Sequence, residues 1–236
     1  MFTMDDVKNT DTRNLLAEID LLRGLSSEQL AWVAQRAHRK LFPAGTNIIT
    51  AETPGEAVYI ILYGTVKIHI EQPDGRDVTL ALLGAGDTVG EMSLIDSVGR
   101  SASALTLEDS LLLWMDRTTF QHMLDDFPPV ARNLVRILSA RVRLSDQLIQ
   151  ALATLDVYGR VARQLLAFAE KYGQPGAGSE ITIPIRLTQG DMSELVGASR
   201  KRVNQVMVAF KGLNLVTEAD GKITVCDREG LAKYCR

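Results

Sequence analysis

The sequence contains few of the residues that bind metals or act as nucleophiles. Its two cysteines, Cys226 and Cys235, cannot supply the four thiolates of an iron–sulfur cluster, which excludes an oxygen sensor of that kind. Its three histidines, His38, His69 and His122, are isolated and lack the spacing of a zinc or haem site. The chain has no Gly-Lys-Ser/Thr phosphate loop and no nucleophile with a histidine beside it. We therefore expect a protein that is not an enzyme.

Long apolar runs are absent as well. No stretch of about 18 apolar residues occurs, so we expect no membrane span. Residues 1–20 alternate acids with polar residues and lack the apolar core of a signal peptide, which predicts a cytoplasmic protein. The 236 residues, 46% of them hydrophobic and 23% charged, are typical of a soluble globular chain with one large or two modest domains.

Positive charge is scarce in the first part of the chain and concentrated in the last. Residues 1–155 carry 14 Lys and Arg against 20 Asp and Glu, a net charge of −6. Residues 156–236 carry 12 against 9, a net charge of +3. The basic C-terminal part is the one that a polyanion would bind, although a charge of +3 is weak support by itself.

The stretch from Gly90 to Ser101 has the composition of a phosphate site. Gly90 lets the backbone approach a ligand closely, and the residues after it can form a short helical turn whose N–H groups attract an anion. Arg100 can bind the same phosphate through its forked guanidinium, and Ser101 can add a hydroxyl. Glu91 would repel a phosphate, so we expect it to accept a hydrogen bond from a ribose hydroxyl. The residues expected to contact this nucleotide are Gly90, Glu91, Met92, Ser93, Arg100 and Ser101.

These residue types alone are also consistent with an ordinary turn that carries a surface ion pair. The full pattern resembles the phosphate-binding cassette of cyclic-nucleotide-binding domains, Gly-Glu-x-(Ser/Ala)-Leu followed by Arg-(Ser/Ala). The matching residues are Gly90, Glu91, Ser93, Leu94, Arg100 and Ser101. With the C-terminal segment described below, the resemblance covers nearly the whole chain. It is to the catabolite-activator and Fnr (CRP/FNR) superfamily of bacterial transcription regulators, and it implies cyclic AMP as the first choice of effector.

Short apolar segments with a period of two follow one another from Leu41 onwards, separated by turns rich in Gly and Pro. The segments expected to be strands are 47–50, 57–62, 65–70, 78–83, 103–107 and 110–115. They predict a small antiparallel roll, and the cassette interrupts it in a way that fits a ligand pocket inside. Residues 11–37, which precede the roll, have helical spacing that breaks near Gly24.

Pro128 begins the longest helical pattern in the chain. Its stripe steps by three and four residues, through Val130, Leu134, Ile137, Arg141, Leu144, Leu148, Ala151 and Leu155. This heptad spacing predicts a coiled-coil helix that forms a homodimer, although a helix packed against its own domain would show a similar stripe. Arg141 is the one charged member of the stripe, so it needs a partner or a ligand.

The resemblance implies that this helix also contributes to the base end of the pocket. Counting back from Asp156, Ser145 falls where the catabolite activator has a hydroxyl that meets adenine, and Asp146 departs from the activator's second hydroxyl. A serine can accept a hydrogen bond from the amino group of adenine, whereas a carboxylate suits the N1–H and N2–H of guanine. Cyclic AMP is therefore the first choice, and guanine ligands such as cyclic GMP and cyclic di-GMP stay open.

The C-terminal third has the pattern of a winged helix-turn-helix. The expected elements are a helix at 158–172, a strand at 181–187, a helix ending at 196, a helix from 199 to about 213 and a hairpin at 215–225. Thr188 and Asp191 form a capping-box start in which aspartate replaces the usual Glu or Gln. Ser199 caps the second helix after the turn at Gly197-Ala198.

A helix-turn-helix also occurs as a packing motif, and basic residues on a helix often only face solvent. Residues 195–204 nevertheless resemble the DNA-reading unit of the same family, which implies double-stranded DNA with two-fold-related half-sites as a partner. The activator has a glutamate in place of Lys201 and an arginine in place of Gln205. The residues expected to contact DNA are Thr188, Gln189, Ser199, Arg200, Lys201, Arg202, Asn204 and Gln205.

We therefore predict an α+β protein with three parts. These are a cyclic-nucleotide-binding β-roll with N-terminal helices at 1–127, a dimerisation helix and hinge at 128–156, and a winged helix-turn-helix DNA-binding domain at 157–236. The expected function is that of a ligand-gated homodimeric transcription regulator, for which the resemblance implies RNA polymerase as a further partner. The alternatives are a regulator of the same family that binds another small molecule or none, and a cyclic-nucleotide-binding regulatory subunit, which would not need the wing.

Overall fold

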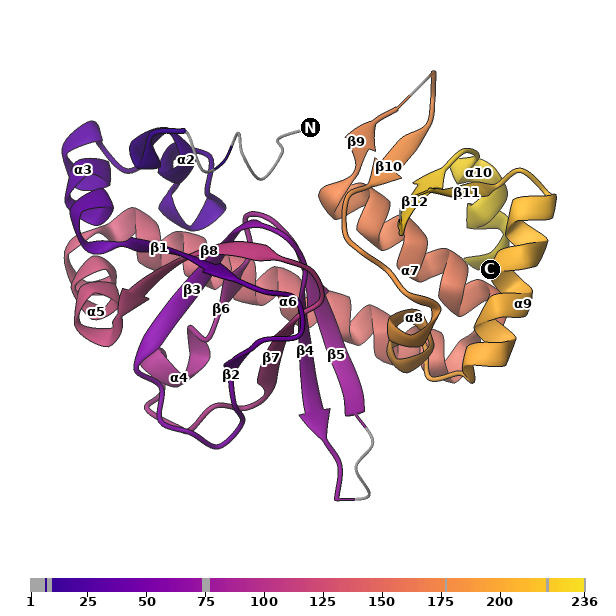
Figure 1. The fold of residues 1–236 in the computed structure, drawn as a ribbon, viewed down its shortest axis with the longest axis horizontal. Coiled ribbons are helices and arrows are strands. Elements are labelled where there is room, and N and C mark those ends of the chain that lie inside the picture. Colours follow the sequence, from indigo (N-terminus) through magenta and orange to yellow (C-terminus); the bar gives the residue numbers. More distant parts are fainter. Residues whose placement is uncertain (1–6, 8–9, 74–76, 177, 220, 236) are drawn as a thin grey trace. The chain divides into compact units, whose positions relative to one another are not determined.

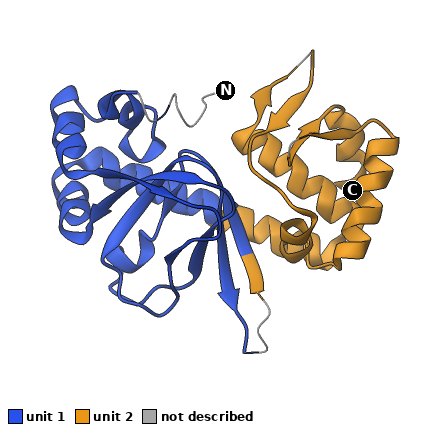
Figure 2. Cartoon of the chain, in the orientation of Figure 1, with its two compact units in different colours: residues 1–76, 80–141 blue, residues 77–79, 142–236 orange. Residues whose placement is uncertain are grey.

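The computed structural model describes residues 7, 10–73, 77–176, 178–219 and 221–235. The chain divides into two compact units, one made of residues 1–76 and 80–141 and the other of residues 77–79 and 142–236 (Figure 2). The long helix α6 (Pro128–Thr154) passes from the first unit into the second at Arg141. The turn predicted within the wing, at residue 220, lies outside the described residues.

The first unit is built on two four-stranded sheets (Figure 1). One has the order β1-β8-β3-β6 and the other β2-β7-β4-β5, and the registers described within them are antiparallel. The strands are β1 (His38–Phe42), β2 (Asn47–Ile49), β3 (Ala57–Tyr63), β4 (Val66–Glu71), β5 (Asp77–Leu83), β6 (Thr88–Val89), β7 (Ser103–Thr106) and β8 (Ser110–Asp116). The predicted antiparallel roll is therefore confirmed, and β1 and β6 are strands that the sequence did not predict.

Alternation along the strands creates two separate cores. The inner core takes one buried residue from each strand: Phe42, Ile49, Ile61, Val66, Leu83, Val89, Ala104 and Leu112. Residues one position away, such as Ile60 and Leu113, belong to the outer core, which the helices cover. A strand exposes successive side chains on opposite faces, so a strand that is apolar at consecutive positions must be buried on both faces.

Helices cover the outer face of the first sheet. They are α2 (Thr12–Ala17), the 3-10 turn η1 (Asp20–Leu22), α3 (Ser27–Arg36), α5 (Arg117–Asp126) and the first half of α6. Helix α3 begins with a capping box between Ser26 and Gln29. The sequence did not predict α5, because only Phe120 and Met123 among its apolar residues are fully buried and two residues make no recognisable stripe. Asp116 caps it by accepting from Thr119 N at 2.7 Å.

The first half of α6 packs against its own unit. Val130 and Leu134 are buried in the outer core, with Ile137 partly buried beside them. Asn133 is buried as well, and its Nδ2 donates to the carbonyls of Leu21 and Arg23 at 3.2 and 2.7 Å. The predicted stripe therefore follows the intramolecular alternative over this half. The most exposed apolar residues of α6 each lie one position after a member of the predicted stripe: Val135 is 64% exposed, Val142 59% and Ile149 64%. Within the predicted stripe, Leu144 is 41% exposed.

The second unit combines helices with a small sheet of order β11-β12-β10-β9. Its remaining elements are α7 (Val157–Tyr172), β9 (Gln174–Pro175), β10 (Ile181–Ile183), α8 (Gln189–Leu195), α9 (Arg200–Gly212), β11 (Val216–Ala219), β12 (Lys222–Val225), α10 (Arg228–Ala232) and η2 (Lys233–Cys235). The predicted helices and hairpin are confirmed. Strand β10 is shorter than predicted and ends before Pro184, which has no N–H to donate to a ladder.

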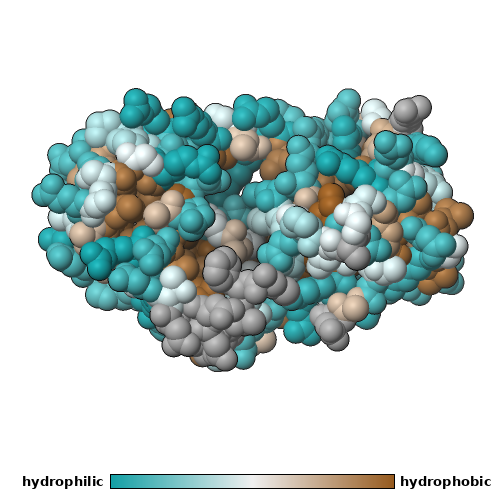
Figure 3. Space-filling model, turned by 90° about the horizontal axis from the view of Figure 1, so that it is seen from above, coloured by the Kyte–Doolittle hydropathy of each residue, from teal (hydrophilic) through white to brown (hydrophobic). Residues whose placement is uncertain are grey.

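On the face shown in Figure 3, hydrophilic residues predominate over both units and apolar residues gather in separate patches. Among the described residues, no helix combines the length and the apolar content needed to cross a membrane.

Candidate functional site

The predicted cassette lies in the first unit, where β6 leads into the short helix α4 (Met92–Ile95). Gly90, at the junction, has a φ of +87°, a conformation that favours glycine. A Cβ added there would lie 2.5 Å from Nη1 of Arg100 and 2.8 Å from Cδ1 of Ile49. Glycine is therefore required for the close approach of the Arg100 guanidinium to this turn.

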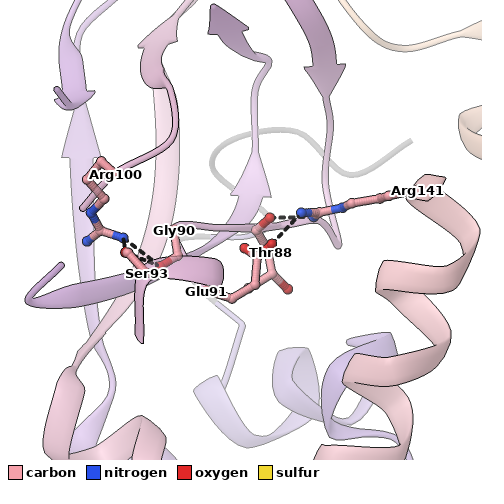
Figure 4. Close-up of polar contacts among 6 residues, drawn as sticks. All are labelled: Thr88, Gly90, Glu91, Ser93, Arg100 and Arg141. Carbon is pink, nitrogen blue, oxygen red and sulfur yellow. Dashed lines mark hydrogen bonds and ion pairs between the residues drawn. The ribbon is translucent and has the colours of Figure 1, made fainter. Parts of the chain in front are cut away.

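Arg100 is a buried cation held by neutral oxygens. Its side chain is only 8% exposed, and its Nη1 donates to the carbonyl of Gly90 at 2.5 Å and to Oγ of Ser93 at 2.8 Å (Figure 4). Its Nη2 donates to the carbonyl of Ala57 on β3 at 2.6 Å. Burial lowers the pKa of Arg100 from its ordinary value, while Tyr59 and Glu91 act in the opposite direction. Among the described residues it forms no ion pair, so this position favours an anion.

Glu91 is buried on the other side of Gly90 and has one oxygen still able to accept. The residue is 2% exposed, and its Oε1 forms an ion pair at 2.6 Å with Nη1 of Arg141, which reaches it from α6 (Figure 4). Nη2 of Arg141 donates to the carbonyl of Thr88 at 2.5 Å. Oε2 of Glu91 is buried and accepts from no described residue. A hydroxyl donor is the group that would complete this carboxylate.

The structure brings Gly90, Glu91, Ser93, Arg100 and Arg141 together, as predicted for the ligand site. Two other predicted members, Met92 and Ser101, are exposed in the same segment. The remaining two, Ser145 and Asp146, are exposed on α6 in the second unit.

Arg117 supports the cassette and was not predicted. It is the first residue of α5, and its Nε donates to the carbonyl of Gly55 at 3.0 Å while its Nη2 donates to the carbonyl of Ser93 at 3.0 Å. It therefore ties α4 to the loop before β3. Its spacing from the cassette carries no motif, and only the three-dimensional arrangement reveals this positioning role.

The helix-turn-helix has the predicted caps. Oγ1 of Thr188 accepts from Asp191 N at 3.1 Å, and Oδ2 of Asp191 accepts from Thr188 N at 3.2 Å, which completes the capping box. Gly197 supplies the turn with a φ of +59°, and Oγ of Ser199 accepts from Arg202 N at 3.3 Å. The hydroxyls of Thr188 and Ser199, both predicted to contact DNA, serve the helix starts in this structure.

Gln189 is the first residue of α8 and is half-buried, whereas the other predicted DNA contacts lie on the exposed face of α9. The opposite face of α9 is buried and consists of Val203, Val206, Met207 and Phe210. Arg200 and Lys201 are exposed in the first turn. Nε2 of Gln189 donates to Oδ1 of Asn204 at 3.0 Å, which links α8 to α9.

Arg202 is drawn towards α7. Its guanidinium carbon lies 5.7 Å from the ring centre of Tyr158, and its Nη1 donates to Oε1 of Gln205 at 3.2 Å. Val208 also lies on the exposed face of α9, one turn beyond Asn204, and is 62% exposed. Val208 follows Lys201 by seven residues, which is two helical turns, so the sequence alone could have placed it on this face.

Family models match both units in turn. Residues 39–127 match the cyclic nucleotide-binding domain, and residues 159–234 match the Crp-like helix-turn-helix domain. A CRP-like cAMP-activated global transcriptional regulator of Mycobacterium tuberculosis is 32% identical over 222 residues, which cover 94% of this chain and 99% of the relative. The cyclic AMP receptor protein of Thermus thermophilus is 33% identical over 205 residues, 87% of this chain and 91% of that protein.

A solved structure shares the fold. FixK2 from Bradyrhizobium japonicum has a TM-score of 0.74 at 19% identity, and the match covers 85% of this chain and 98% of that chain. The cassette, the winged helix-turn-helix and these relatives lead to one conclusion. The chain belongs to the CRP/FNR family of bacterial transcription regulators, with a cyclic nucleotide-binding domain and a Crp-like helix-turn-helix domain.

Proposed function

We propose that the protein is a homodimeric transcription regulator gated by cyclic AMP. The observation that carries the proposal is the pair of buried groups on either side of Gly90: a cation without an ion-pair partner among the described residues, and a carboxylate oxygen without a donor. Arg100 suits the cyclic phosphate and Glu91 suits the ribose hydroxyl. Because the proposed targets are DNA and RNA polymerase, we place the protein in the cytoplasm.

Gating requires that the ligand binds the arrangement that is competent to bind DNA more tightly than the arrangement that is not. The phosphate and ribose contacts are common to all cyclic mononucleotides, so the base must be selected elsewhere. Relatives described as cAMP-activated, 32% and 27% identical to this chain, support cyclic AMP. Asp146 is the one residue that favours a guanine ligand, and CLP of Xanthomonas campestris, described as c-di-GMP responsive, shares the fold at 23% identity and a TM-score of 0.67.

We expect cyclic AMP to bind at least about tenfold more tightly than cyclic GMP and cyclic di-GMP, and this preference to survive the substitution Asp146→Ser. We expect this because we propose that Asp146 pairs with an arginine of the partner subunit and does not contact the base. Isothermal titration calorimetry of both proteins with the three nucleotides measures the preference. A shift towards adenine in Asp146→Ser would show that the carboxylate reads the base. Absence of binding by all three would contradict the proposed effector.

The exposed residues of α6 support the proposed homodimer. Val135, Val142 and Ile149 recur every seven residues. Three residues after each of them come Leu138, Ser145 and Leu152, of which Leu138 is half-buried and the other two are exposed. In heptad terms the first set occupies position a and the second position d. β-branched residues at a with leucine at d favour a parallel, two-stranded coiled coil. We call these six residues the exposed stripe.

A parallel dimer also suits the proposed target. A two-fold axis along α6 relates the two copies of the second unit, as two half-sites on DNA require. The exposed stripe is displaced by one residue from the predicted one, which corresponds to a rotation of about 100° around the helix. The two registers therefore predict different contacts between the subunits.

Single cysteines distinguish these registers. In a chain with Cys226→Ser and Cys235→Ser, we expect Ser145→Cys to form an intersubunit disulfide under mild oxidation, because d positions face each other across a parallel coiled coil. Leu144→Cys, one residue away, is the matched control and should cross-link at least about tenfold more slowly. Non-reducing electrophoresis measures the rates. Faster cross-linking at residue 144 would restore the register predicted from the sequence, and no cross-linking at either position would contradict dimerisation through α6.

A further inference from the structure

The charge pattern of α6 can give Arg141 a second partner in the proposed homodimer, on which this inference rests. Helix α6 has four arginines, at positions 132, 136, 141 and 143, and Asp146 is its one acidic residue. Two parallel copies would place two such basic helices side by side. The single acid of this basic helix can pair with an arginine of the other copy if the heptad register brings it to the contact between the two helices.

The exposed stripe fixes that register. With Val135, Val142 and Ile149 at a, Arg141 occupies position g and Asp146 position e of the next heptad. In a parallel coiled coil, the residue at g of one helix meets the residue at e five positions later on the other, and such pairs set partner choice and orientation. The other g–e pairs, Leu134 with Ser139 and Leu148 with Ala153, carry no charge. Arg141 and Asp146 form the one oppositely charged pair.

We propose that Arg141 is shared between Glu91 of its own ligand site and Asp146 of the partner subunit. The geometry of one subunit supports this arrangement. Nη1 of Arg141 binds the buried Glu91 at 2.6 Å, while the Arg141 side chain is 26% exposed and extends from the flank of the helix next to the exposed stripe. Asp146 is exposed in the same helix.

Sharing has a consequence for gating. A guanidinium has five N–H donors, so it can serve two carboxylates, but each carboxylate weakens its attraction to the other. A ligand hydroxyl that donates to Oε2 of Glu91 draws on the negative charge of this carboxylate, so the attraction of its Oε1 for Arg141 weakens. The guanidinium is then more available to Asp146 of the partner subunit. Occupation of the pocket thereby strengthens the pairing between the two helices.

The test measures the dimer dissociation constant by sedimentation at low protein concentration, without nucleotide. We expect Asp146→Asn to raise it about three- to tenfold, because the two-fold axis creates two equal pairs and each partly exposed pair has a modest effect. The increase should shrink in about 1 M NaCl, where charges are screened within a few ångströms. Arg143→Gln, which removes a charge from an outer position of the same helix, is the matched control.

Double variants identify the partner of Asp146. In an Arg141→Gln background, Asp146→Asn should have no further effect, whereas in Arg143→Gln and in Arg141→Lys it should keep its effect. In Glu91→Gln, which releases Arg141 from its own pocket, the Asp146→Asn effect should grow about twofold. An unchanged dissociation constant in Asp146→Asn, or an effect that survives Arg141→Gln, would overturn the proposal.

The cysteine experiment separates this proposal from the homodimer on which it rests. If Ser145→Cys cross-links and Asp146→Asn leaves the dimer dissociation constant unchanged, the homodimer stands and only the sharing of Arg141 is rejected. Failure of the cross-link would reject both the homodimer through α6 and the sharing of Arg141. Arg141→Lys keeps the positive charge, so it tests the pair even if Arg141→Gln lowers the stability of the fold.

Discussion

Replacement of Arg100 by leucine is expected to weaken cyclic AMP binding from about 30-fold to several thousandfold, which corresponds to about 2–5 kcal/mol. The guanidinium is buried and fixed by the oxygens of Gly90, Ser93 and Ala57, so it is already oriented when an anion arrives. A leucine fills part of the space but offers no positive charge to the cyclic phosphate. A phosphate transferred there from water would lose hydration without gaining a partner.

The measurement is calorimetric titration with cyclic AMP, together with thermal unfolding of each protein. Arg23→Leu is the matched control, because the same substitution is made at a largely exposed arginine in the same unit. Arg100→Lys keeps the charge and loses the fork, so its affinity should fall between the two. If Arg100→Leu folds and binds cyclic AMP with unchanged affinity, the assignment of the pocket is wrong.

The part of the site that could be predicted from sequence is the part made by neighbours in the chain. Gly90 and Arg100 are ten residues apart, and the conformation of Gly90 makes room for the guanidinium, so one motif contains both. The capping box of Thr188 and Asp191 is equally local. In both cases the hydrogen bonds connect residues that are ten positions apart or fewer.

Contacts between distant segments explain what the sequence did not reveal. Arg141 was recognised as needing a partner, but Glu91 lies 50 positions away, and only the packing of α6 on the roll selects that carboxylate. Arg117 contacts Ser93 of the cassette across a gap of 24 positions. The predicted dimer stripe does not hold over the first half of α6, for a related reason. An apolar stripe on a helix indicates burial but not the surface that buries it. Val130 and Leu134 are buried by their own subunit.

The recognition helix is expected to select a half-site that keeps the guanine facing Arg200 and differs from that of the catabolite activator at its neighbours. Arg200 follows the cap of α9, where a side chain that enters the major groove can bind O6 and N7 of guanine. Lys201 stands where the activator has a glutamate. A glutamate accepts from N4 of cytosine, whereas a lysine only donates, so that contact must move to guanine or phosphate.

Gln205 changes the next position, because glutamine pairs with N6 and N7 of adenine where arginine would choose guanine. Its Oε1 accepts from Arg202, which itself lies over Tyr158, so the amide is held at the exposed face by a neighbour. Each altered base pair is expected to change the binding free energy by about 1–3 kcal/mol. Selection of sites from random DNA measures these preferences without assuming the target.

Alanine at position 200 separates base reading from phosphate binding. Arg200→Ala should relax the preference at one base pair in each half-site and leave the others intact, since a side chain bound to one guanine carries information about that position alone. A contact to phosphate would instead weaken all sequences alike and lower the salt dependence of binding. Arg228→Ala, at the start of α10, is the control for loss of one positive charge from the same unit. Recovery of the activator's half-site by the unmodified protein would show that Lys201 and Gln205 do not read bases.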